Sequence, residues 1–433
     1  MLKRLVLALL PSLLLALPQG KHVTHGKADV TCTDSRMTVN QSTDKAIIDW
    51  SSFSIGKGEK TLFVQPSKNA AILNRVVGGD ISRIYGSLQA NGQLFLINEK
   101  GIVVGPSGVI SAHSFVGSCL SIENQDFLNE HYQFEGVAGS TFTNHGKIEA
   151  SKNIILLAPS VDQQGTLSAN VNTAIAAATD VYFCDTEEQL IVKVSGEGTL
   201  EQSGGIESAY AQLRAAGGEP SQLAINQTGY IHATGLQERN GEIFLVAENG
   251  RIESEGSLKD PGGKIHLLAD VVNLDKELHV DVSSTTRGGE VLIGGDYQGK
   301  NPEIRNAQAV FVGEGVQIDA SAKERGDGGK VIVWGDYQNV FQGNIQAEGG
   351  QLSGDGGFVE ISSPMGLHYK GTVTTLAPHG KIGTLLFDPV NVNVIGGGVS
   401  APAFPTTLPG TYAPGVNATL ELGDIRPLSK LTS

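Results

Sequence analysis

The sequence predicts an all-β fold, namely a parallel β-helix, which is a solenoid of stacked coils. Three observations favour this class. The 433 residues include 56 glycines, which penalise long helices. Hydrophobic residues make up 40% of the chain, which suits short strands between tight turns. Segments that begin with Gly-Gly and continue with alternating apolar residues recur along the chain, as expected for stacked structural repeats.

Four segments share the Gly-Gly start, and they are GGKIHLLAD from Gly262, GGEVLIGGD from Gly288, GGKVIVWGD from Gly328 and GGFVEISSP from Gly356. Side chains two residues apart in a strand share one face. The side chains two residues after each Gly-Gly pair should therefore stack in the core. They belong to Ile265, Val291, Val331 and Val359. The residues that face the other way vary in polarity, so we expect that face to be unconstrained; they are His266, Leu292, Ile332 and Glu360.

The Gly-Gly steps of 26, 40 and 28 residues are irregular, which favours a β-helix over a β-propeller. The step of 40 residues carries either a loop or an additional coil. At roughly 20–28 residues per coil, the roughly 415 residues from 17 to 433 predict on the order of 15–20 coils. We expect the β-helix to run from about residue 25 to about residue 394.

Two regions depart from the strand pattern. The stretch SAYAQLRAA, from Ser208 to Ala216, predicts a short helix outside the solenoid. Residues 395–433 are rich in glycine and proline and are interpreted as a linker with a truncated end, which once led into further repeats.

Residues 1–16 are typical of a signal peptide. Lys3 and Arg4 precede an apolar stretch that is too short to span a bilayer, and cleavage after Ala16 fits the pattern. We therefore expect export through the Sec translocon. A buried N-terminal helix is the alternative, which Pro11 disfavours.

The charge and the cysteines exclude several classes of function. The net charge of −14 argues against binding to nucleic acid or to an anionic membrane. The three cysteines, Cys32, Cys119 and Cys184, form no C-x-x-C pair, so neither a zinc site nor a redox motif is indicated. We expect them to be small buried hydrophobic residues, with at most one adventitious disulfide.

Residues 46–122 allow a family to be named. AIIDWSSFSIGKGE, NAAILNRVVGGDISRIYGSLQANGQLFLIN and NEKGIVVGPSGVI strongly resemble the two-partner-secretion (haemagglutination activity) domain of filamentous-haemagglutinin exoproteins. The segments GGEVLIGGDYQGKNP and GDGGKVIVWGDYQ look like the repeats that follow this domain in large adhesins. The resemblance implies a single-stranded right-handed parallel β-helix with small extra-helical elements. It places a secretion domain at 17–260 and further β-helix repeats at 261–394.

The resemblance also implies a partner, an outer-membrane barrel transporter whose periplasmic POTRA domains recognise the exported chain. Matched to the family's NPNGI-type motif, the recognised positions here are Asn98, Gly101 and Ile102. Glu99 and Lys100 replace the usual Pro and Asn, and no NPNL-like segment is present. The segment is a turn in any case, because Asn and Gly tolerate left-handed backbone, and we expect its side chains to be accessible.

The function that this resemblance implies is that of a secreted or surface-exposed adhesin that binds host or neighbouring-cell surfaces. Two alternatives stay open, namely the carrier part of a contact-dependent toxin and a β-helix enzyme acting on polysaccharide. Serine-hydrolase, phosphate-loop and HExxH motifs are missing from the sequence, so we expect neither enzymatic activity nor a cofactor.

Several smaller motifs are candidate sites. Asp296 and Asp336 lie in duplicated GDYQ elements that could stack as a carboxylate cluster, and GDGG occurs at Gly326 and at Gly354. We interpret all of these as turns, and we expect no metal site, including at the pair His22 and His25. The tripeptide Arg325-Gly326-Asp327 is a possible receptor-binding motif in an exposed turn.

Overall fold

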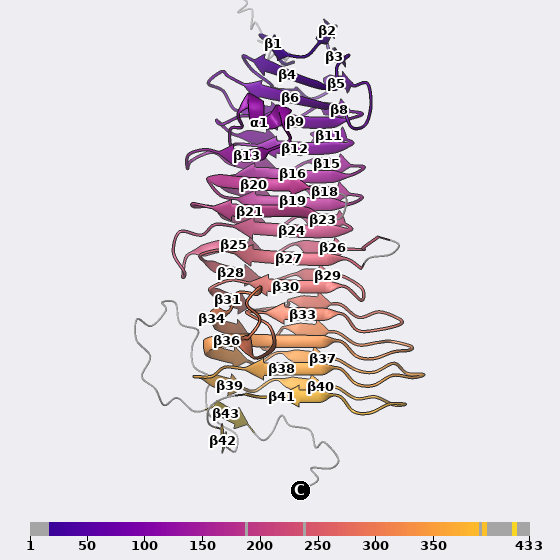
Figure 1. The fold of residues 1–433 in the computed structure, drawn as a ribbon, viewed down its shortest axis with the longest axis vertical. Coiled ribbons are helices and arrows are strands. Elements are labelled where there is room, and N and C mark those ends of the chain that lie inside the picture. The colour runs from indigo at the N-terminus through magenta and orange to yellow at the C-terminus, as the bar shows by residue number, and fades with distance from the viewer. Residues whose placement is uncertain (1–16, 187–188, 237–239, 389–391, 396–417, 422–433) are drawn as a thin grey trace, which may run out of the picture.

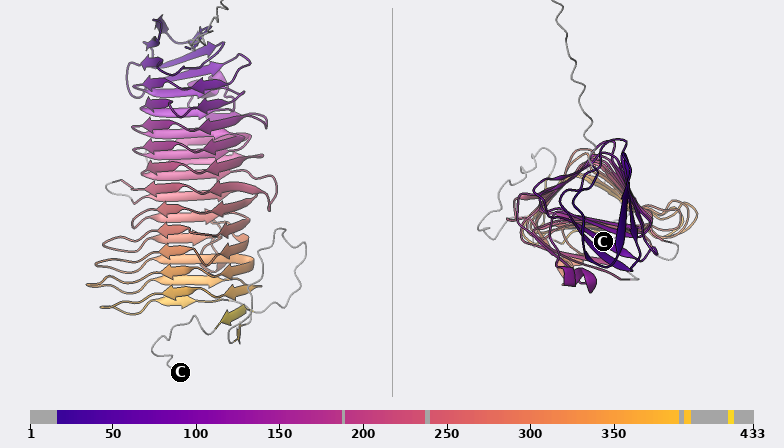
Figure 2. Two further views of the ribbon diagram at one scale, coloured as in Figure 1. Left: turned by 180° about the vertical axis from the view of Figure 1, so that it is seen from behind. Right: turned by 90° about the horizontal axis from the view of Figure 1, so that it is seen from above.

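The computed structural model describes residues 17–186, 189–236, 240–388, 392–395 and 418–421. These residues form one continuous right-handed parallel β-helix (Figure 1). Seen along its axis, the helix has three faces around a filled interior (Figure 2). The expected signal peptide at 1–16 lies outside the described residues, as does most of the expected linker at 395–433.

Each coil runs in the order sheet 1, sheet 2, sheet 3. Sheet 1 consists of β1 (His22–His25), β4 (Lys45–Trp50), β6 (Ala71–Val76), β9 (Gln93–Ile97), β12 (Ser114–Ser118), β16 (Asn153–Ala158), β19 (Asn172–Ala177), β24 (Tyr210–Ala215), β27 (Glu242–Ala247), β30 (Lys264–Leu268), β33 (Glu290–Ile293), β36 (Lys330–Phe341), β38 (Phe358–Ser362) and β41 (Thr384–Leu386).

Sheet 2 consists of β7 (Ser82–Ile84), β10 (Ile102–Val104), β14 (Thr141–Asn144), β17 (Ser160–Gln163), β22 (Thr199–Gln202), β25 (Leu223–Gln227), β28 (Arg251–Ser254), β31 (Val271–Leu274), β34 (Ala307–Val312), the second half of β36, β39 (Leu367–Tyr369), β42 (Val392–Ile395) and β43 (Ala418–Glu421).

Sheet 3 consists of β2 (Ala28–Cys32), β3 (Arg36–Gln41), β5 (Lys60–Val64), β8 (Ser87–Ala90), β11 (Val109–Ala112), β15 (Lys147–Ala150), β18 (Thr166–Ala169), β23 (Gly205–Ser208), β26 (Tyr230–Ala233), β29 (Ser257–Lys259), β32 (His279–Asp281), β35 (Gln317–Asp319), β37 (Asn344–Gln346) and β40 (Thr372–Thr374).

The first strands close the N-terminal edge of the solenoid. β1 pairs antiparallel with β4, and β2 pairs antiparallel with β3, whereas the later neighbours within sheets 1 to 3 are parallel. β1 and β2 therefore cover the first parallel strands of sheets 1 and 3. Since β2 is the only antiparallel strand among the 14 of sheet 3, the described chain makes 13 coils, fewer than the 15–20 expected.

Coil length explains this difference. Coil length is the number of residues between a residue and its partner in the next coil. In one short coil, Ile148 pairs with Leu167, 19 residues later. Three coils are much longer. Ile110 pairs with Ile148, Leu167 with Ile206 and Val280 with Ile318, which are steps of 38, 39 and 38 residues. Each long coil carries an extra-helical element, so the long Gly-Gly step holds a loop and not an additional coil.

The predicted inward stack is confirmed. Ile265, Val291, Val331 and Val359 pair in consecutive register and are fully buried in the central core. The opposite face of sheet 1 is buried as well, which corrects the expectation that it is unconstrained. Leu292 and Ile332 pack with Trp334 beneath the loop that contains the short 3-10 helix η1 (Tyr297–Gly299).

The helix predicted at Ser208–Ala216 is wrong, since these residues end β23 and form β24. Ala211, Leu213 and Ala215 point into the core, and β24 pairs with β19 and β27 over its whole length. The residues Ala, Gln, Leu and Arg favour helices in isolation, but a two-residue apolar period between two neighbouring coils overrides that preference. Within the described residues, no helix has the length and apolar character needed to cross a membrane.

Candidate functional site

The predicted motif turn lies at the corner between β9 and β10, on the N-terminal half of the rod (Figure 1). The Asn98 side chain holds this corner together. Its amide donates to the carbonyl oxygen of Asp80 at 2.9 Å and to Ser82 Oγ at 3.0 Å, and its Oδ1 accepts from the backbone N–H of Lys100 at 2.9 Å. The carbonyl oxygen of Asn98 accepts from the N–H of Gly101 at 3.0 Å, which closes the turn.

The three motif residues are buried, which contradicts the expectation that their side chains are accessible. Asn98 is 1% exposed, and Ile102 is 0% exposed within the central core. Gly101 has φ +124, and a Cβ there would lie 3.2 Å from the carbonyl oxygen of Thr141. The exposed side chains of the turn are Glu99 and Lys100, where the sequence departs from the family motif.

An extra-helical cluster, here called the flap, covers the outer face of sheet 1 beside this corner. The flap comprises α1 (Asn124–Leu128), β13 (Tyr132–Glu135), β20 (Asp180–Asp185) and β21 (Leu190–Ser195), and its three strands form a small antiparallel sheet. Phe95 of β9 packs edge-on against Phe127 and stacks on Tyr132, with ring centroids 5.2 and 5.5 Å apart. The flap therefore rests on the strand that leads into the motif turn.

Polar contacts anchor the flap to the coils beneath it. The Arg75 guanidinium donates to the carbonyl oxygen of Ile122 and to Asn124 Oδ1. Lys152 Nζ lies 2.5 Å from Asp185 Oδ2, which also accepts from the Asn153 amide at 2.9 Å. Neither α1 nor the flap sheet was predicted from the sequence, whose only signals for them are the two lengthened coils.

The second candidate site, Arg325-Gly326-Asp327, lies in a series of stacked loops that project from the C-terminal half of the rod (Figure 2). We call residues 283–287, 321–327, 348–355 and 375–381 the loop stack. Arg325 and Asp327 are exposed as expected, but the tripeptide is not a free turn. Arg325 forms a parallel bridge with Ser353, and the N–H of Gly326 donates to the carbonyl oxygen of Ser353 at 2.7 Å.

Aspartates of the loop stack join one coil to the next. Asp327 Oδ1 accepts from the backbone N–H of Asp355 at 2.7 Å, and Asp355 Oδ1 accepts from the N–H of Lys381 at 2.7 Å. The two GDGG sequences are therefore turns whose carboxylates accept backbone hydrogen bonds, in agreement with the prediction.

The duplicated GDYQ elements do not stack. Asp296 accepts from the N–H of Tyr297 at the start of η1, whereas Asp336 lies inside β36 and accepts from Trp334 Nε1 at 2.7 Å. Burial opposes ionisation of Asp296, but hydrogen bonds from Lys330 and Asn301 outweigh it and lower the pKa to about 2. Among the described residues, no group of three or more His, Cys, Asp or Glu side chains is placed to hold a metal ion.

The cysteines are free thiols in three different environments. Cys119 is buried, as expected, and burial raises the pKa of its thiol to about 12. Cys184 is partly buried and Cys32 is exposed, so the expectation of three buried residues is wrong. Cys32 ends β2 in the antiparallel N-terminal cap, outside the stacked coils that bury the core.

Comparisons with known proteins identify the family. The model of the TPS secretion domain matches residues 15–260. Two heme/hemopexin-binding proteins of Haemophilus influenzae are 28% identical over 258 residues (56% of this chain) and 27% identical over 340 residues (70% of this chain). This chain spans only 28% and 34% of their lengths.

A solved structure agrees with the fold. The HMW1 secretion domain from Haemophilus influenzae superposes with a TM-score of 0.70 at 29% identity, and the match covers 86% of this chain and all of that domain. The chain therefore belongs to the TPS secretion domain family, whose members are exported with a partner outer-membrane transporter and are secreted or surface-associated in Gram-negative bacteria.

Proposed function

We propose that this chain is the secretion module and first rod segment of a surface adhesin, delivered through a POTRA-barrel transporter after Sec-dependent removal of residues 1–16. The observation that carries the proposal is the family match over residues 15–260, on a β-helix that continues without a break to β41. The rod past residue 260 presents the loop stack, where the side chains of Leu352 and Leu376 are about half exposed, as is that of the adjoining Ile382. Exposed apolar side chains on projecting loops suit contact with a host or neighbouring-cell surface.

We infer that the transporter reads Asn98, Gly101 and Ile102 before this coil folds. These residues are buried in the folded chain, so folded protein offers only Glu99 and Lys100 at this turn. An exported chain has to pass a barrel pore unfolded, and parallel coils close slowly because their contacts are non-local. After the chain has passed the pore, folding would bury the motif, and the transporter would then release the chain.

The test compares unfolded and folded ligands of the POTRA domains. A peptide of residues 90–106 should bind, its Asn98→Asp variant should bind at least about tenfold more weakly, and folded protein should bind less well than the peptide. Glu99→Ala with Lys100→Ala should leave secretion unchanged, like the control pair Lys147→Ala and Glu149→Ala on sheet 3. If the folded protein binds best and Glu99→Ala with Lys100→Ala abolishes secretion, the motif is read after folding.

Binding of heme or hemopexin is a second candidate function. The observation that favours it is the name shared by both curated relatives, one of which aligns with 70% of this chain. Titration of the purified chain with hemin should produce a shifted and saturable Soret band if this function resides in the segment. An unshifted Soret band, together with no retention on immobilised hemopexin, would remove this candidate.

A further inference from the structure

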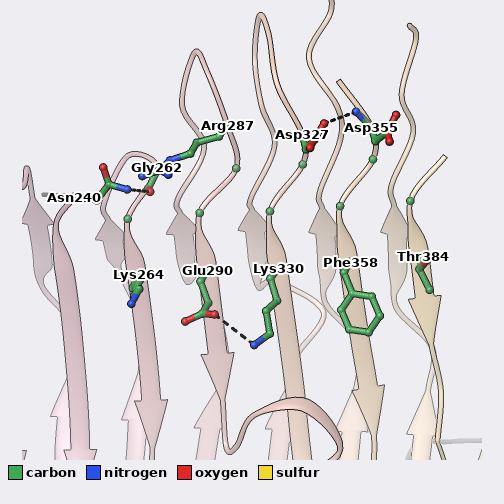
Figure 3. Close-up of a pocket in the computed structure, with 18 of the residues that line it drawn as sticks. Asn240, Gly262, Lys264, Arg287, Glu290, Asp327, Lys330, Asp355, Phe358 and Thr384 are labelled. Carbon is green, nitrogen blue, oxygen red and sulfur yellow. Dashed lines mark hydrogen bonds and ion pairs between the residues drawn. The ribbon is translucent and has the colours of Figure 1, made fainter. Parts of the chain in front are cut away.

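A groove runs along the rod where the loop stack meets sheet 1, and Figure 3 shows the residues that line it. It crosses six consecutive coils, from Asn240 to Thr384, and its volume is about 930 Å³. At about 4.8 Å per coil, the groove is roughly 24 Å long and parallel to the rod axis. Successive Gly-Gly pairs form the floor of the groove. The groove is shallow and open at both ends.

The backbone of this floor is already paired. The N–H groups of Gly288, Gly328 and Gly356 donate to the carbonyl oxygens of Asp327, Asp355 and Lys381, at 2.9, 2.9 and 2.8 Å. A peptide strand that docks by β-addition needs free backbone donors and acceptors. A ligand in this groove is therefore held by side chains.

The two walls supply those side chains. One wall is the row of first strand residues, which are in register from coil to coil: Glu242, Lys264, Glu290, Lys330, Phe358 and Thr384. The other wall belongs to the loop stack and presents Arg287, Asp327, Asp355 and Lys381. In Figure 3, Arg287 extends from its loop toward Gly262, across the open side of the floor.

The charges on the walls balance. The groove is lined by four basic residues (Lys264, Arg287, Lys330 and Lys381) and by four acidic residues (Glu242, Glu290, Asp327 and Asp355). Lys330 lies 3.4 Å from Glu290 and 2.5 Å from Asp296, so this basic residue is paired within the protein. A dense polyanion needs a basic surface, which this groove does not provide.

We propose that this groove binds a linear glycan of low charge density. Side chains of both signs can donate to and accept from sugar hydroxyl groups, and Phe358, which is partly exposed and lies 5.8 Å from the Tyr297 ring, offers an aromatic face for one sugar ring. A pyranose unit is about as long as the spacing between coils, so successive sugars can face successive coils. The inference rests on the proposed surface function, and it names the class of surface molecule that the rod contacts.

Two neighbouring loops of the stack provide a matched pair of variants for the test. Arg287 lines the groove, whereas Arg325, on the next loop, does not; both side chains are exposed, so neither alanine variant disturbs the core. Phe358→Ala is matched by Tyr230→Ala, which removes an exposed aromatic ring from sheet 3. Thermal melting confirms that each variant is folded.

The experiment measures binding of the purified chain to linear hexasaccharides of β-linked glucose and of β-linked N-acetylglucosamine by calorimetry, with heparin as the polyanion. We expect at least one hexasaccharide to bind in 0.5 M NaCl, Arg287→Ala to weaken this binding about tenfold and Arg325→Ala to change it less than about twofold. Binding of none of the hexasaccharides, an equal loss in both arginine variants, or binding to heparin alone that salt abolishes would overturn the proposal. Arg287→Ala should be secreted normally, so failure of export and failure of glycan binding are separate results.

Discussion

Gly329 lies directly over Gly289, the equivalent glycine one coil earlier. A Cβ on Gly329 would lie 2.0 Å from the carbonyl oxygen of Gly289. The relation repeats through the stack, since a Cβ on Gly357 would meet the carbonyl oxygen of Gly329 at 2.2 Å, and one on Gly383 would meet that of Gly357 at 2.1 Å. Gly329, Gly357 and Gly383 are therefore required by the close approach of the coils and not by an unusual backbone angle.

We expect Gly329→Ala to destabilise the rod by about 1–3 kcal/mol or more, because two backbones must separate to admit the methyl group. Gly79→Ala is the matched control. Gly79 also follows a glycine, but a Cβ there would meet no atom within 4 Å. Urea unfolding followed by circular dichroism measures both variants, and equal midpoints would contradict the steric explanation.

Asn98→Asp should destabilise the folded chain by at least about 2 kcal/mol. The change removes the amide that donates to the Asp80 carbonyl oxygen and to Ser82, and it places a carboxylate in a site that is 1% exposed. Glu99→Gln, at the exposed neighbour, should shift stability by less than about 0.5 kcal/mol. Thermal melts compare the two, and an unchanged melt for Asn98→Asp would show that the corner tolerates the loss of its hydrogen bonds.

Phe183→Ala should release the flap and leave the coils beneath it folded. Phe183 stacks on Tyr132 and Phe134 with ring centroids 4.7 and 5.7 Å apart, and truncating such a ring costs about 3–5 kcal/mol. Because each coil of a solenoid contacts only its neighbours, this loss should stay local.

Hydrogen exchange at β13, β20 and β21 measures the release of the flap. Exchange there should accelerate, while β27 to β31 stay protected. Phe341→Ala, which removes a core ring stacked on Tyr369, should instead accelerate exchange in β36 and β39. Uniform acceleration in Phe183→Ala would mean that the flap and the rod unfold together.

The stability of the chain should fall as the pH rises from about 4 to about 7, because Asp260 loses its proton less readily in the folded chain than in the unfolded chain. This side chain is fully buried and its Oδ2 accepts from the N–H of Lys264 at 2.9 Å; burial raises its pKa from 3.8 to about 7. Between about pH 4 and pH 7 the folded chain holds a proton that the unfolded chain has released, so raising the pH removes up to about 4 kcal/mol of stability.

Asp260→Asn should remove this pH dependence, because an amide does not titrate. Free energies of unfolding at pH 5 and pH 8 measure it in both proteins, and the difference between the two pH values should be smaller in the variant. Parallel pH profiles would show that Asp260 is ionised in the folded chain.

The periodic part of the fold could be predicted from the sequence because a strand face repeats every second residue. The register from Ile265 to Val359 follows directly from that period and the Gly-Gly marker. A second marker was missed at the corner between sheets 2 and 3. There Gln163, Gln202 and Gln227 are stacked and buried, and each donates to the carbonyl oxygen of the glycine two residues later.

The site could be predicted less well than the fold. The turn expected at residues 98–102 is present in the structure, but sequence pattern alone does not reveal that Asn98 folds back onto Asp80 and Ser82. The flap could not be predicted because its strands belong to two different coils, so β13 and β20 are about 45 residues apart in the chain. The helix predicted at 208–216 was wrong because the intrinsic helix preference of these residues does not include their strand pairing with the neighbouring coils.

The register gives the rod an adjustable length. Leu258 pairs with Val280 in the next coil, so residues 258–279 are one complete turn of the solenoid, and removing them would bring β27 opposite β33 with the inward side chains still in line. Evolution can in the same way duplicate or delete single turns without redesigning the interior. Molecules of this architecture can therefore differ in the length of the rod while they keep the same N-terminal secretion domain.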